Sequence, residues 1–284
     1  MRLYVINVGV NANDAQKYQL RSPIFSDRSF EFVPIRESER FSEVGTIPRY
    51  CDLPSWTGRW NSLARLLPEK QSKALVHHDP DFEYLTYGDI PSSRGAALKG
   101  AEPGDQLWFL ARLWEHDGSR FLGGSGFFFV GVFVVEANLL FENGIGDCPT
   151  ALRARLESNA HWHRREAGDC GTFRVLFGSS NGSRRFCSAI EVTPGLAEHL
   201  FASSYDPQTG GFASEGQLVR NKNGKPRFWR HFGSITRTVQ WFLDSNQPSH
   251  REHLAVLDSL AKKAGSATQT VPGKLSSLGR TCRP

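Results

Sequence analysis

The sequence lacks the features that place a chain in a membrane or on a secretory route. No apolar run among its 284 residues is long enough to cross a bilayer. The initial run, MRLYVINVGV, has neither the basic flank nor the cleavage site of a secretory signal. These absences predict a soluble, cytoplasmic protein that makes no membrane contact.

Cysteine is scarce, and its spacing forms no recognisable pattern. The five cysteines are odd in number and widely separated, and neither a CxxC nor an HxxxH pair accompanies them. In a chain without a signal peptide, this distribution predicts free thiols. His161 and His163 lie between Cys148 and Cys170, but without paired spacing they are not predicted to bind zinc. We therefore expect no metal and no other cofactor.

Nucleotide-cofactor motifs are absent as well. The chain has neither GxGxxG nor a P-loop, which argues against a transferase that uses a nucleotide-linked donor. No tight cluster of acids and lysine, which a metal nuclease would need, stands out. Apolar residues, by contrast, are plentiful: they make up 39% of the chain, and twenty residues are Phe. That content can bury a full core in one large or two small domains.

Positive charge is concentrated toward the C-terminus. From Leu218 onward there are twelve Lys or Arg against three acids, whereas residues 1–217 carry more acids than bases. A basic end on a mildly acidic body predicts contact with a polyanion, and a solvated basic face without a partner is the alternative. We expect a core over 1–217, a basic helical extension packed on it over 218–264, and a disordered tail over 265–284.

Apolar runs predict the strands. Arg2 to Val10 is apolar and β-branched, which is typical of a buried strand. Gln106–Trp114 and Phe127–Glu136 are strongly hydrophobic, and the glycine-rich connection between them predicts an antiparallel hairpin. Phe173–Gly178 adds another strand. The expected fold class is α+β: a curved antiparallel sheet or a β-barrel, flanked by helices.

Helical periodicity and short apolar clusters predict helices around these strands. The predicted segments are Asn61–Leu67, Ser93–Gly100, Thr150–Leu156, Pro194–Phe201, Gly233–Leu243 and His253–Lys263. The last segment has leucines on one stripe and lysines near its C-terminus, where they suit the helix dipole.

The stretch Leu20–Ile35 predicts one wall of a functional site. Two short apolar runs flank a polar tetrad, and in the second run two phenylalanines alternate with Glu31 and Val33 on the other face. In one interpretation the polar residues of this stretch face a substrate; in the other they lie on a solvated strand edge. The candidates are Arg21, Ser22, Phe25, Asp27 and Glu31.

Two further polar segments are candidate binding elements. The segment from His77 to Asp89 is dense in acids, histidines and aromatics, which is typical of a functional loop, with a solvated loop as an equal alternative. Ser179–Ser183, followed by Arg184 and Arg185, is a turn of small polar residues. Such a turn either cradles a phosphate with its backbone amides or closes an ordinary hairpin.

The chain resembles the nucleotide-modification-associated domain family, type 3, over roughly Met1–Thr193. The resemblance lies in the ordered blocks NVGVN, SPIFSDRSFEFVPI, DPDFEYLTYGD, PGDQLWFLARLW, FFFVGVFVVE and NAHWHRR. The Gly104-Asp105 turn and the strands after it also resemble the barrel of the PUA-like superfamily, which includes EVE and ASCH domains. The resemblance implies such a barrel, and a role in systems that make, recognise or counter hypermodified DNA bases.

The chain departs from the family pattern at two places. That pattern favours an acid and glycines just after the first strand, where this chain has Asn11-Ala12-Asn13-Asp14, and a glycine where Arg28 stands. An asparagine can bind a base edge but cannot act as a general base. If the acid of the family is catalytic, Asp14, Asp27 or Asp89 is the substitute here.

The first function that we expect is a DNA glycosylase that flips out and excises a bulky modified base, such as glucosylated hydroxymethylcytosine, in anti-phage defence. Such an enzyme stacks the extruded base on aromatics, reads its edge with amides and places a carboxylate near the deoxyribose. The alternatives are a non-catalytic reader of modified bases and a nuclease or base-modifying transferase. DNA is the expected partner in every case, with no obligate protein partner.

These roles give three sets of candidate residues. The catalytic candidates are Asp14, Asp27, Glu31 and Asp89. The base- or substrate-binding candidates are Asn11, Asn13, Arg21, Ser22, Phe25, Tyr84, Tyr87, Asn159, His161 and Trp162. The candidates for contact with the DNA backbone are Ser179, Ser183, Arg184, Arg185, Lys222, Lys225, Arg227, Arg230 and Arg237.

Overall fold

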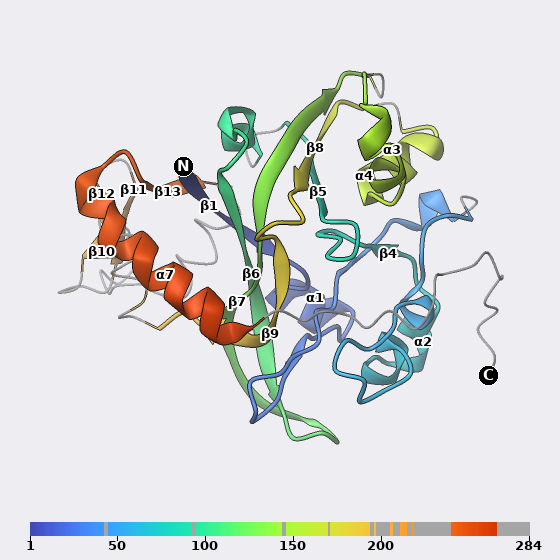
Figure 1. Cartoon of the computed structure of the whole chain (residues 1–284). Coiled ribbons are helices and arrows are strands. Elements are labelled where there is room, and N and C mark those ends of the chain that lie inside the picture. Colours follow the sequence, from blue (N-terminus) through green and yellow to red (C-terminus); the bar gives the residue numbers. More distant parts are fainter. Residues whose placement is uncertain are drawn as a thin grey trace.

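Two long strands form the centre of the protein, β6 (Gln106–His116) and β7 (Phe121–Phe141). They pair antiparallel over most of their length and confirm the predicted hairpin (Figure 1). The computed structural model describes residues 1–42, 45–91, 95–143, 146–169, 171–193, 196, 205–206, 211–214, 217–218 and 240–265.

The central hairpin belongs to an eight-stranded sheet with the order β13-β1-β6-β7-β8-β5, in which β2 also pairs with β6 and β9 with β7. Two of the pairings, β1 with β6 and β2 with β6, are parallel, and the others are antiparallel. The other strands are β1 (Arg2–Val8), β2 (Pro23–Ile24), β5 (Thr86–Asp89), β8 (Phe173–Gly178), β9 (Arg184–Glu191) and β13 (Gln240–Asp244).

The sheet is mostly antiparallel, as predicted, but the predicted barrel is wrong. A barrel closes only when its two end strands pair. Here the end strands are β5 and β13, and within the described part of the chain each of them pairs on one side only. β7 exchanges partners along its length, from β6 to β8. Beyond β7 the sheet therefore continues through β8 to β5, and β5 does not pair with β13.

The remaining elements are short. A two-stranded ribbon joins β3 (Ile35–Arg36) to β4 (Val76–His77), and a three-stranded sheet contains β10 (Tyr205–Asp206), β11 (Gly211–Ser214) and β12 (Gln217–Leu218). The α-helices in the described residues are α1 (Ala12–Lys17), α2 (Glu69–Ser72), α3 (Thr150–Glu157), α4 (Ala160–Glu166) and α7 (Arg251–Ala264). The 3-10 helices are η1 (Glu39–Phe41), η2 (Tyr50–Asp52), η3 (Leu63–Leu66), η4 (Ala96–Gly100) and η5 (Pro248–His250).

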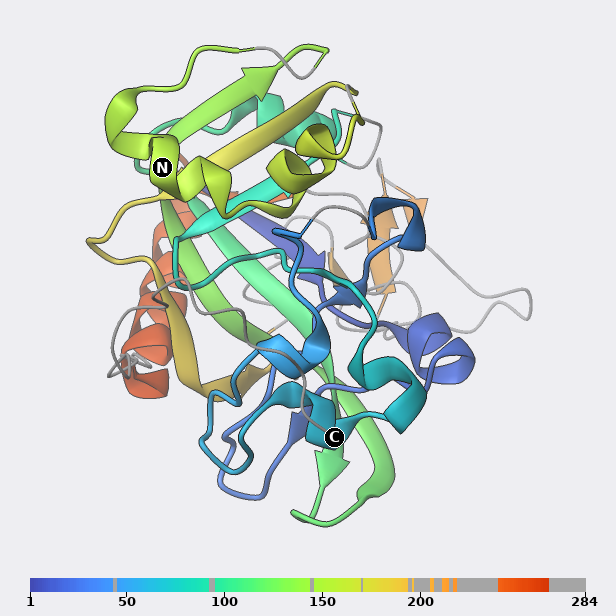
Figure 2. The same cartoon turned by 90° about the vertical axis from the view of Figure 1, so that its right-hand side faces the viewer.

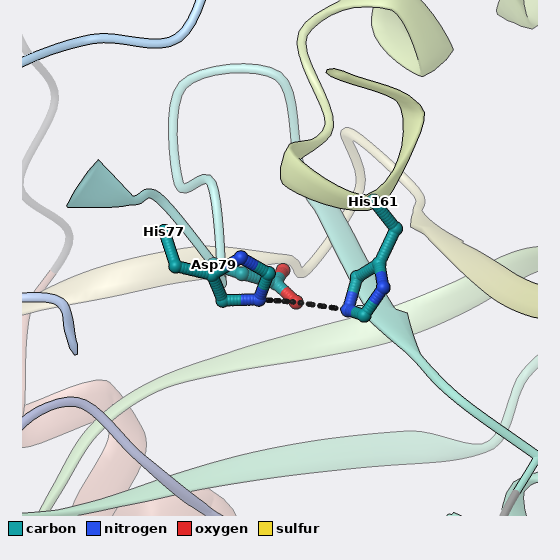
Figure 3. A group of neighbouring side chains, drawn as sticks. All are labelled: His77, Asp79 and His161. Atoms are coloured by element: carbon teal, nitrogen blue, oxygen red, sulfur yellow. Dashed lines mark ion pairs between the residues drawn. The ribbon is translucent and has the colours of Figure 1, made fainter. Parts of the chain in front are cut away.

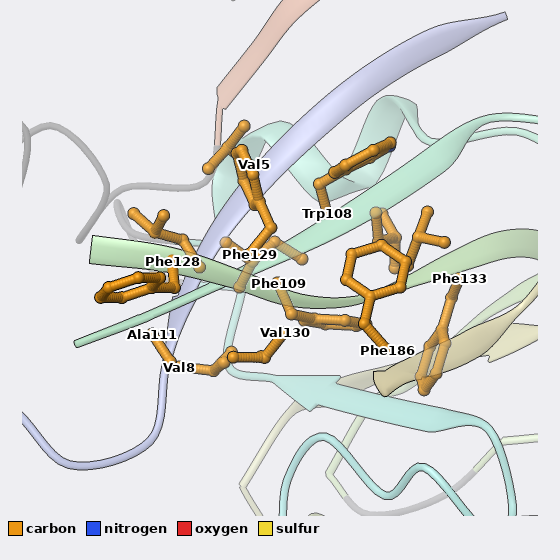
Figure 4. Close-up of a cluster of buried hydrophobic side chains, with 14 of the residues drawn as sticks. Val5, Val8, Trp108, Phe109, Ala111, Phe128, Phe129, Val130, Phe133 and Phe186 are labelled. Carbon is orange, nitrogen blue, oxygen red and sulfur yellow. The ribbon is translucent and has the colours of Figure 1, made fainter. Parts of the chain in front are cut away.

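The central strands are covered on both faces. Helix α7 packs on one side, and the loops and short helices of the first ninety residues lie on the other (Figures 1 and 2). Burial of both faces explains why β6 and β7 are continuous apolar runs and do not alternate with polar residues. Figure 4 shows part of the buried core to which these strands contribute; Trp108, Phe109, Phe129, Phe133 and Phe186 are at most 1% exposed.

Of the two helices predicted over 233–243 and 253–263, the second is confirmed. Helix α7 is confirmed, and Leu257, Ala261 and Ala264 bury its apolar stripe. The helix predicted over Gly233–Leu243 is wrong at its end, because residues 240–244 form β13, which pairs antiparallel with β1. The free edge of β1 offers backbone hydrogen bonds that override the helical spacing of the sequence. The first part of that segment, the segment 194–201 apart from Leu196, and the tail 266–284 lie outside the described residues.

The other helical predictions hold to different degrees. Thr150–Leu156 is confirmed as α3. The predicted helix at 61–67 is a single 3-10 turn, η3, and the one at 93–100 is the 3-10 helix η4 where it is described. None of the described helices has the length and apolar character needed to span a membrane. Cys51 is disulfide-bonded, so the prediction of free thiols is wrong there, whereas Cys148 and Cys187 are free.

Close packing at Gly131, in the middle of β7, gives a test of this core. A Cβ added at this position would collide with the Phe82 ring and would lie 2.8 Å from the Arg184 carbonyl oxygen. Since neither neighbour can move freely, we expect Gly131→Ala to lower the free energy of unfolding by about 2 kcal/mol. Urea denaturation of the wild type and the variant measures this change in the free energy of unfolding. In Gly45→Ala, which meets nothing within 4 Å, the change should stay within about 0.5 kcal/mol. Equal effects would contradict the packing described here.

Candidate functional site

A cavity of about 470 Å³ opens beside the end of β1, where α1, β5 and α4 meet. We call it the Asp79 cavity. Its walls are mostly polar, although it lies next to the apolar core. The lining residues are Ile6, Asn7, Val8, Gly9, Asn11, Asn13, Ile35, His77, Asp79, Tyr87, Gly88, Asp89, Ile90, His161 and Arg164.

Asp79 lies at the floor of the cavity, just after β4. Its side chain is almost fully buried, and both carboxylate oxygens accept from the Gly88 backbone N–H, at 3.1 and 3.0 Å. Burial raises the pKa of Asp79 well above its ordinary value, because the charged form loses its hydration. Such a carboxyl either holds a proton or requires a cation beside it.

Two histidines approach Asp79 from different elements, as Figure 3 shows. His77 comes from β4, and its Nε2 lies 3.9 Å from Asp79 Oδ2. His161 comes from the first turn of α4, and its Nε2 lies 3.8 Å from the same oxygen. Burial lowers the pKa of both histidines, and the proximity of His77 adds to the effect at His161. Both imidazoles are therefore neutral at physiological pH, with one ring nitrogen free to accept or to coordinate.

Glu37 contacts His77 at the ring nitrogen that faces away from Asp79. Its Oε2 lies 2.9 Å from His77 Nδ1, and Arg164 donates to both of its oxygens, at 2.7 and 2.9 Å. Burial alone would raise the pKa of Glu37, but the hydrogen bonds from His77 and Arg164 outweigh it and hold the pKa at about 2. A carboxylate, a guanidinium and an imidazole thus form one compensated buried network.

The position of His161 depends on contact between α4 and β5. Asn159 caps α4 by accepting from His161 N–H at 3.0 Å, and its amide donates to Thr86 Oγ1 of β5. A Cβ at Gly88 would collide with the His161 ring and would lie 2.8 Å from Asn159 Oδ1. Glycine is therefore required at position 88 for α4 to bring His161 over Asp79.

Asparagines form another part of the cavity wall. Asn11 caps α1 by accepting from the N–H groups of Asn13 and Asp14, and Asp14 in turn accepts from Asn11 N–H at 2.9 Å. Both asparagines line the cavity. The carboxylate of Asp14, a predicted catalytic group, serves as the second half of this capping box.

Asp89 and Tyr87 lie on β5 at the cavity. The Tyr87 hydroxyl donates to Asp89 Oδ2 at 3.2 Å, and the Ile90 N–H donates to Oδ1 at 2.7 Å. Burial raises the pKa of Tyr87 well above its ordinary value, so the hydroxyl keeps its proton and remains a donor. The Asp89 carboxylate is thus held in a fixed orientation at the wall.

The cavity brings together five predicted site residues from three parts of the sequence: Asn11, Asn13, Tyr87, Asp89 and His161. The predictions missed Glu37, His77, Asp79 and Arg164. For His77 and Asp79 a signal was present, since both lie in the segment that was singled out as a candidate loop. Their convergence with His161, and the support from Glu37 and Arg164, required the tertiary structure.

Asp27 belongs to a second cavity, of about 390 Å³, which we call the Asp27 cavity. There Asp27 accepts from Ser29 and pairs with Arg59 at 2.8 Å. Arg185 lines the same cavity, lies between the rings of Phe30 and Trp56, and donates to the Phe30 carbonyl at 2.6 Å. Its burial lowers its pKa to about 10. The predicted acids Asp27 and Asp89 therefore lie in different cavities.

The other predicted residues of Leu20–Ile35 are built into the packing. Phe30–Val33 is buried on both faces, so the predicted solvent or substrate face is wrong. Glu31 is 0% exposed and accepts four hydrogen bonds from the loop at Ser55–Thr57. Ser22 Oγ accepts from Val33 N–H, Phe25 packs against Trp60 and His116, and Arg21 lies over the Phe121 ring.

The remaining predicted residues are dispersed. Tyr84 is 39% exposed, Asn159 is the buried cap of α4, and Trp162 stacks with Arg165 and packs on Phe141. In the turn before β9, Ser179 Oγ accepts from Asn181 N–H, Ser183 Oγ accepts from Val134 N–H, and Arg184 donates to the Gly182 carbonyl. Lys222, Lys225, Arg227, Arg230 and Arg237 lie outside the described residues.

The family model described as nucleotide modification associated domain 3 matches residues 2–237. The chain belongs to this family. The resemblance read from the sequence blocks is confirmed, and membership links the chain to nucleotide modification. No curated protein and no solved structure matches it.

The Glu37 network predicts a specific dependence of stability on pH. Because the pKa of Glu37 falls from 4.5 to about 2 on folding, its contribution is complete above pH 4.5 and is lost as the pH falls toward 2. Glu37→Gln should lower the free energy of unfolding by about 3 kcal/mol at pH 7 and by progressively less below pH 4.5.

Urea denaturation of both proteins between pH 3 and pH 7 measures this difference. The control is Glu39→Gln, because Glu39 pairs with Arg36 at the exposed surface and its loss should cost less than about 1 kcal/mol. A difference for Glu37→Gln that does not change with pH would show that the ionised carboxylate is not the stabilising group.

Proposed function

We propose that this protein is a glycosylase that receives one base-modified nucleotide in the Asp79 cavity and hydrolyses its N-glycosidic bond. The observation that carries the proposal is the convergence of two acids, an aromatic ring and three amide side chains on one cavity. Its volume, about 470 Å³, is within the usual range of small-molecule sites, about 300–1,000 Å³. The family link to nucleotide modification agrees with such a substrate.

Recognition of an extruded base requires polar groups at its edge and an apolar face beside it. Asn7, Asn11 and Asn13 supply amides, which donate and accept and so suit the mixed edges of a base. Tyr87 supplies an aromatic wall, and Ile6 an aliphatic one. This combination favours a nucleobase over a purely anionic or purely apolar ligand.

Asp89 is the residue that we place at the reacting sugar. As the C1′–N bond breaks, its electron pair leaves with the base and positive charge develops on the sugar. A carboxylate held by Tyr87 and the Ile90 N–H stabilises that charge without reorganising. Water then adds its oxygen to C1′; one of its protons ends on the departing base, and the hydroxyl remains on the sugar.

The phosphate backbone would be bound outside the cavity. The basic residues from Leu218 onward remain the predicted contact, together with Arg184 at the start of β9. Arg185, which was predicted with them, is buried and donates to a backbone carbonyl, so we no longer place it at the DNA surface.

An abasic-site assay tests the proposal. The protein is incubated with duplexes that carry cytosine, hydroxymethylcytosine or glucosylated hydroxymethylcytosine, and the DNA is then heated in alkali. We expect breaks that depend on the modification. Asp89→Asn should lower the excision rate by about 100-fold or more, with DNA affinity unchanged, because only transition-state stabilisation is lost.

Asp147→Asn is the matched control. Asp147 is exposed and does not line the Asp79 cavity, so this variant should excise at the wild-type rate. Excision by Asp89→Asn at the wild-type rate would remove Asp89 from the mechanism. Binding of modified DNA without breaks would identify a reader, and breaks before alkali treatment that need added Mg²⁺ would identify a nuclease.

A further inference from the structure

We propose that His77, Asp79 and His161 bind a divalent transition-metal ion at the floor of the Asp79 cavity. Each residue offers one ligand atom, and the three atoms lie within 4.8 Å of one another. The two histidine-to-aspartate separations, 3.9 and 3.8 Å, exceed hydrogen-bonding distance. The atoms therefore converge without satisfying one another, and the point between them suits a cation.

The separations are close to those of a metal site. Ligands about 2.0–2.1 Å from a tetrahedral zinc ion lie roughly 3.4 Å apart. The observed triangle has two sides of 3.9 and 3.8 Å and none longer than 4.8 Å, so the three side chains would draw together on binding the ion. Figure 3 shows the Asp79 carboxylate between the two imidazoles, with His161 reaching in from α4 and His77 from β4.

The surrounding hydrogen bonds are those that orient metal ligands. A metal-bound histidine commonly donates its other ring N–H to a carboxylate, which fixes the tautomer. His77 Nδ1 lies 2.9 Å from Glu37 Oε2, which leaves Nε2 with its lone pair toward Asp79. Arg164 holds Glu37 with two hydrogen bonds, and the Gly88 N–H holds the Asp79 carboxylate.

Charge balance and donor type restrict the ion. Asp79 is a buried carboxyl, and a bound cation compensates its negative charge in a place that water reaches poorly. Two imidazole nitrogens and one carboxylate oxygen suit Zn²⁺ or Fe²⁺, whereas Mg²⁺ and Ca²⁺ prefer oxygen ligands. The described part of the chain supplies three protein ligands, which leaves at least one position of a tetrahedral ion for a ligand from the cavity.

An ion there would offer that open position to water or substrate within the cavity that Asp89 also lines. It would lower the pKa of a bound water and so supply a nucleophile at neutral pH. The site rests on its own geometry and not on the glycosylase proposal. Metal binding and base excision can therefore succeed or fail separately.

Metal binding by the full-length protein is measured after removal of bound ions with a chelator. Calorimetry with Zn²⁺, with Fe²⁺ in the absence of oxygen, and with Mg²⁺ gives stoichiometry and affinity. We expect about one Zn²⁺ or Fe²⁺ per chain and no competition from Mg²⁺. Thermal unfolding of the same samples should show stabilisation by the bound ion.

The variants separate this site from adventitious binding. His161→Gln, which keeps a polar side chain of similar size, and Asp79→Asn should each lose binding by about 100-fold or more, and Glu37→Gln by about 10- to 100-fold. His78→Ala, next to His77 but outside the cluster, should bind as the wild type does.

Failure of the wild type to bind Zn²⁺ or Fe²⁺ would overturn the proposal, as would unchanged affinity and thermal stabilisation in His161→Gln. A wild type that binds about one ion and yet excises no base would keep the metal site and remove the glycosylase.

Discussion

The candidate site depends on the absence of a side chain at Gly88. Without a Cβ there, the first turn of α4 packs directly on β5, Asn159 caps the helix, and the His161 ring reaches Asp79. The same glycine gives its backbone N–H to both oxygens of Asp79. One residue thus sets the position of two of the three convergent side chains, and any larger residue would separate β5 from α4.

Around this contact two buried carboxyls, Glu37 and Asp79, have opposite environments. Glu37 is ionised and held by Arg164 and His77, whereas Asp79, among the described residues, accepts from the Gly88 N–H and has two neutral imidazoles beyond hydrogen-bonding distance. An unpaired buried carboxyl is expensive to maintain in a stable fold. Its presence beside a polar cavity is the pattern that a ligand or an ion would complete.

The large sheet supplies the rigidity on which this arrangement rests. The central strands β6 and β7 are covered on both faces, and their aromatic side chains interlock with Phe82, from the loop that leads into β5. The segment that carries Asp79 and Tyr87 is therefore anchored to the core by Phe82, between these two residues, and to α4 through Thr86 and Gly88. Side chains on such a support keep their separations, which is what catalysis or metal binding requires.

The sequence by itself determined the elements whose information is local. The apolar runs of β1, β6, β7 and β8, the amphipathic stripe of α7, and the family blocks were readable without coordinates. The importance of the segment from His77 to Asp89 was readable from its composition. Only the tertiary structure decided that Glu31 is a buried structural acid, that 240–244 is a strand paired with β1, and that His77 and Asp79 meet His161. The physical reason is that burial, strand pairing and side-chain convergence depend on contacts between distant segments, which local patterns do not encode.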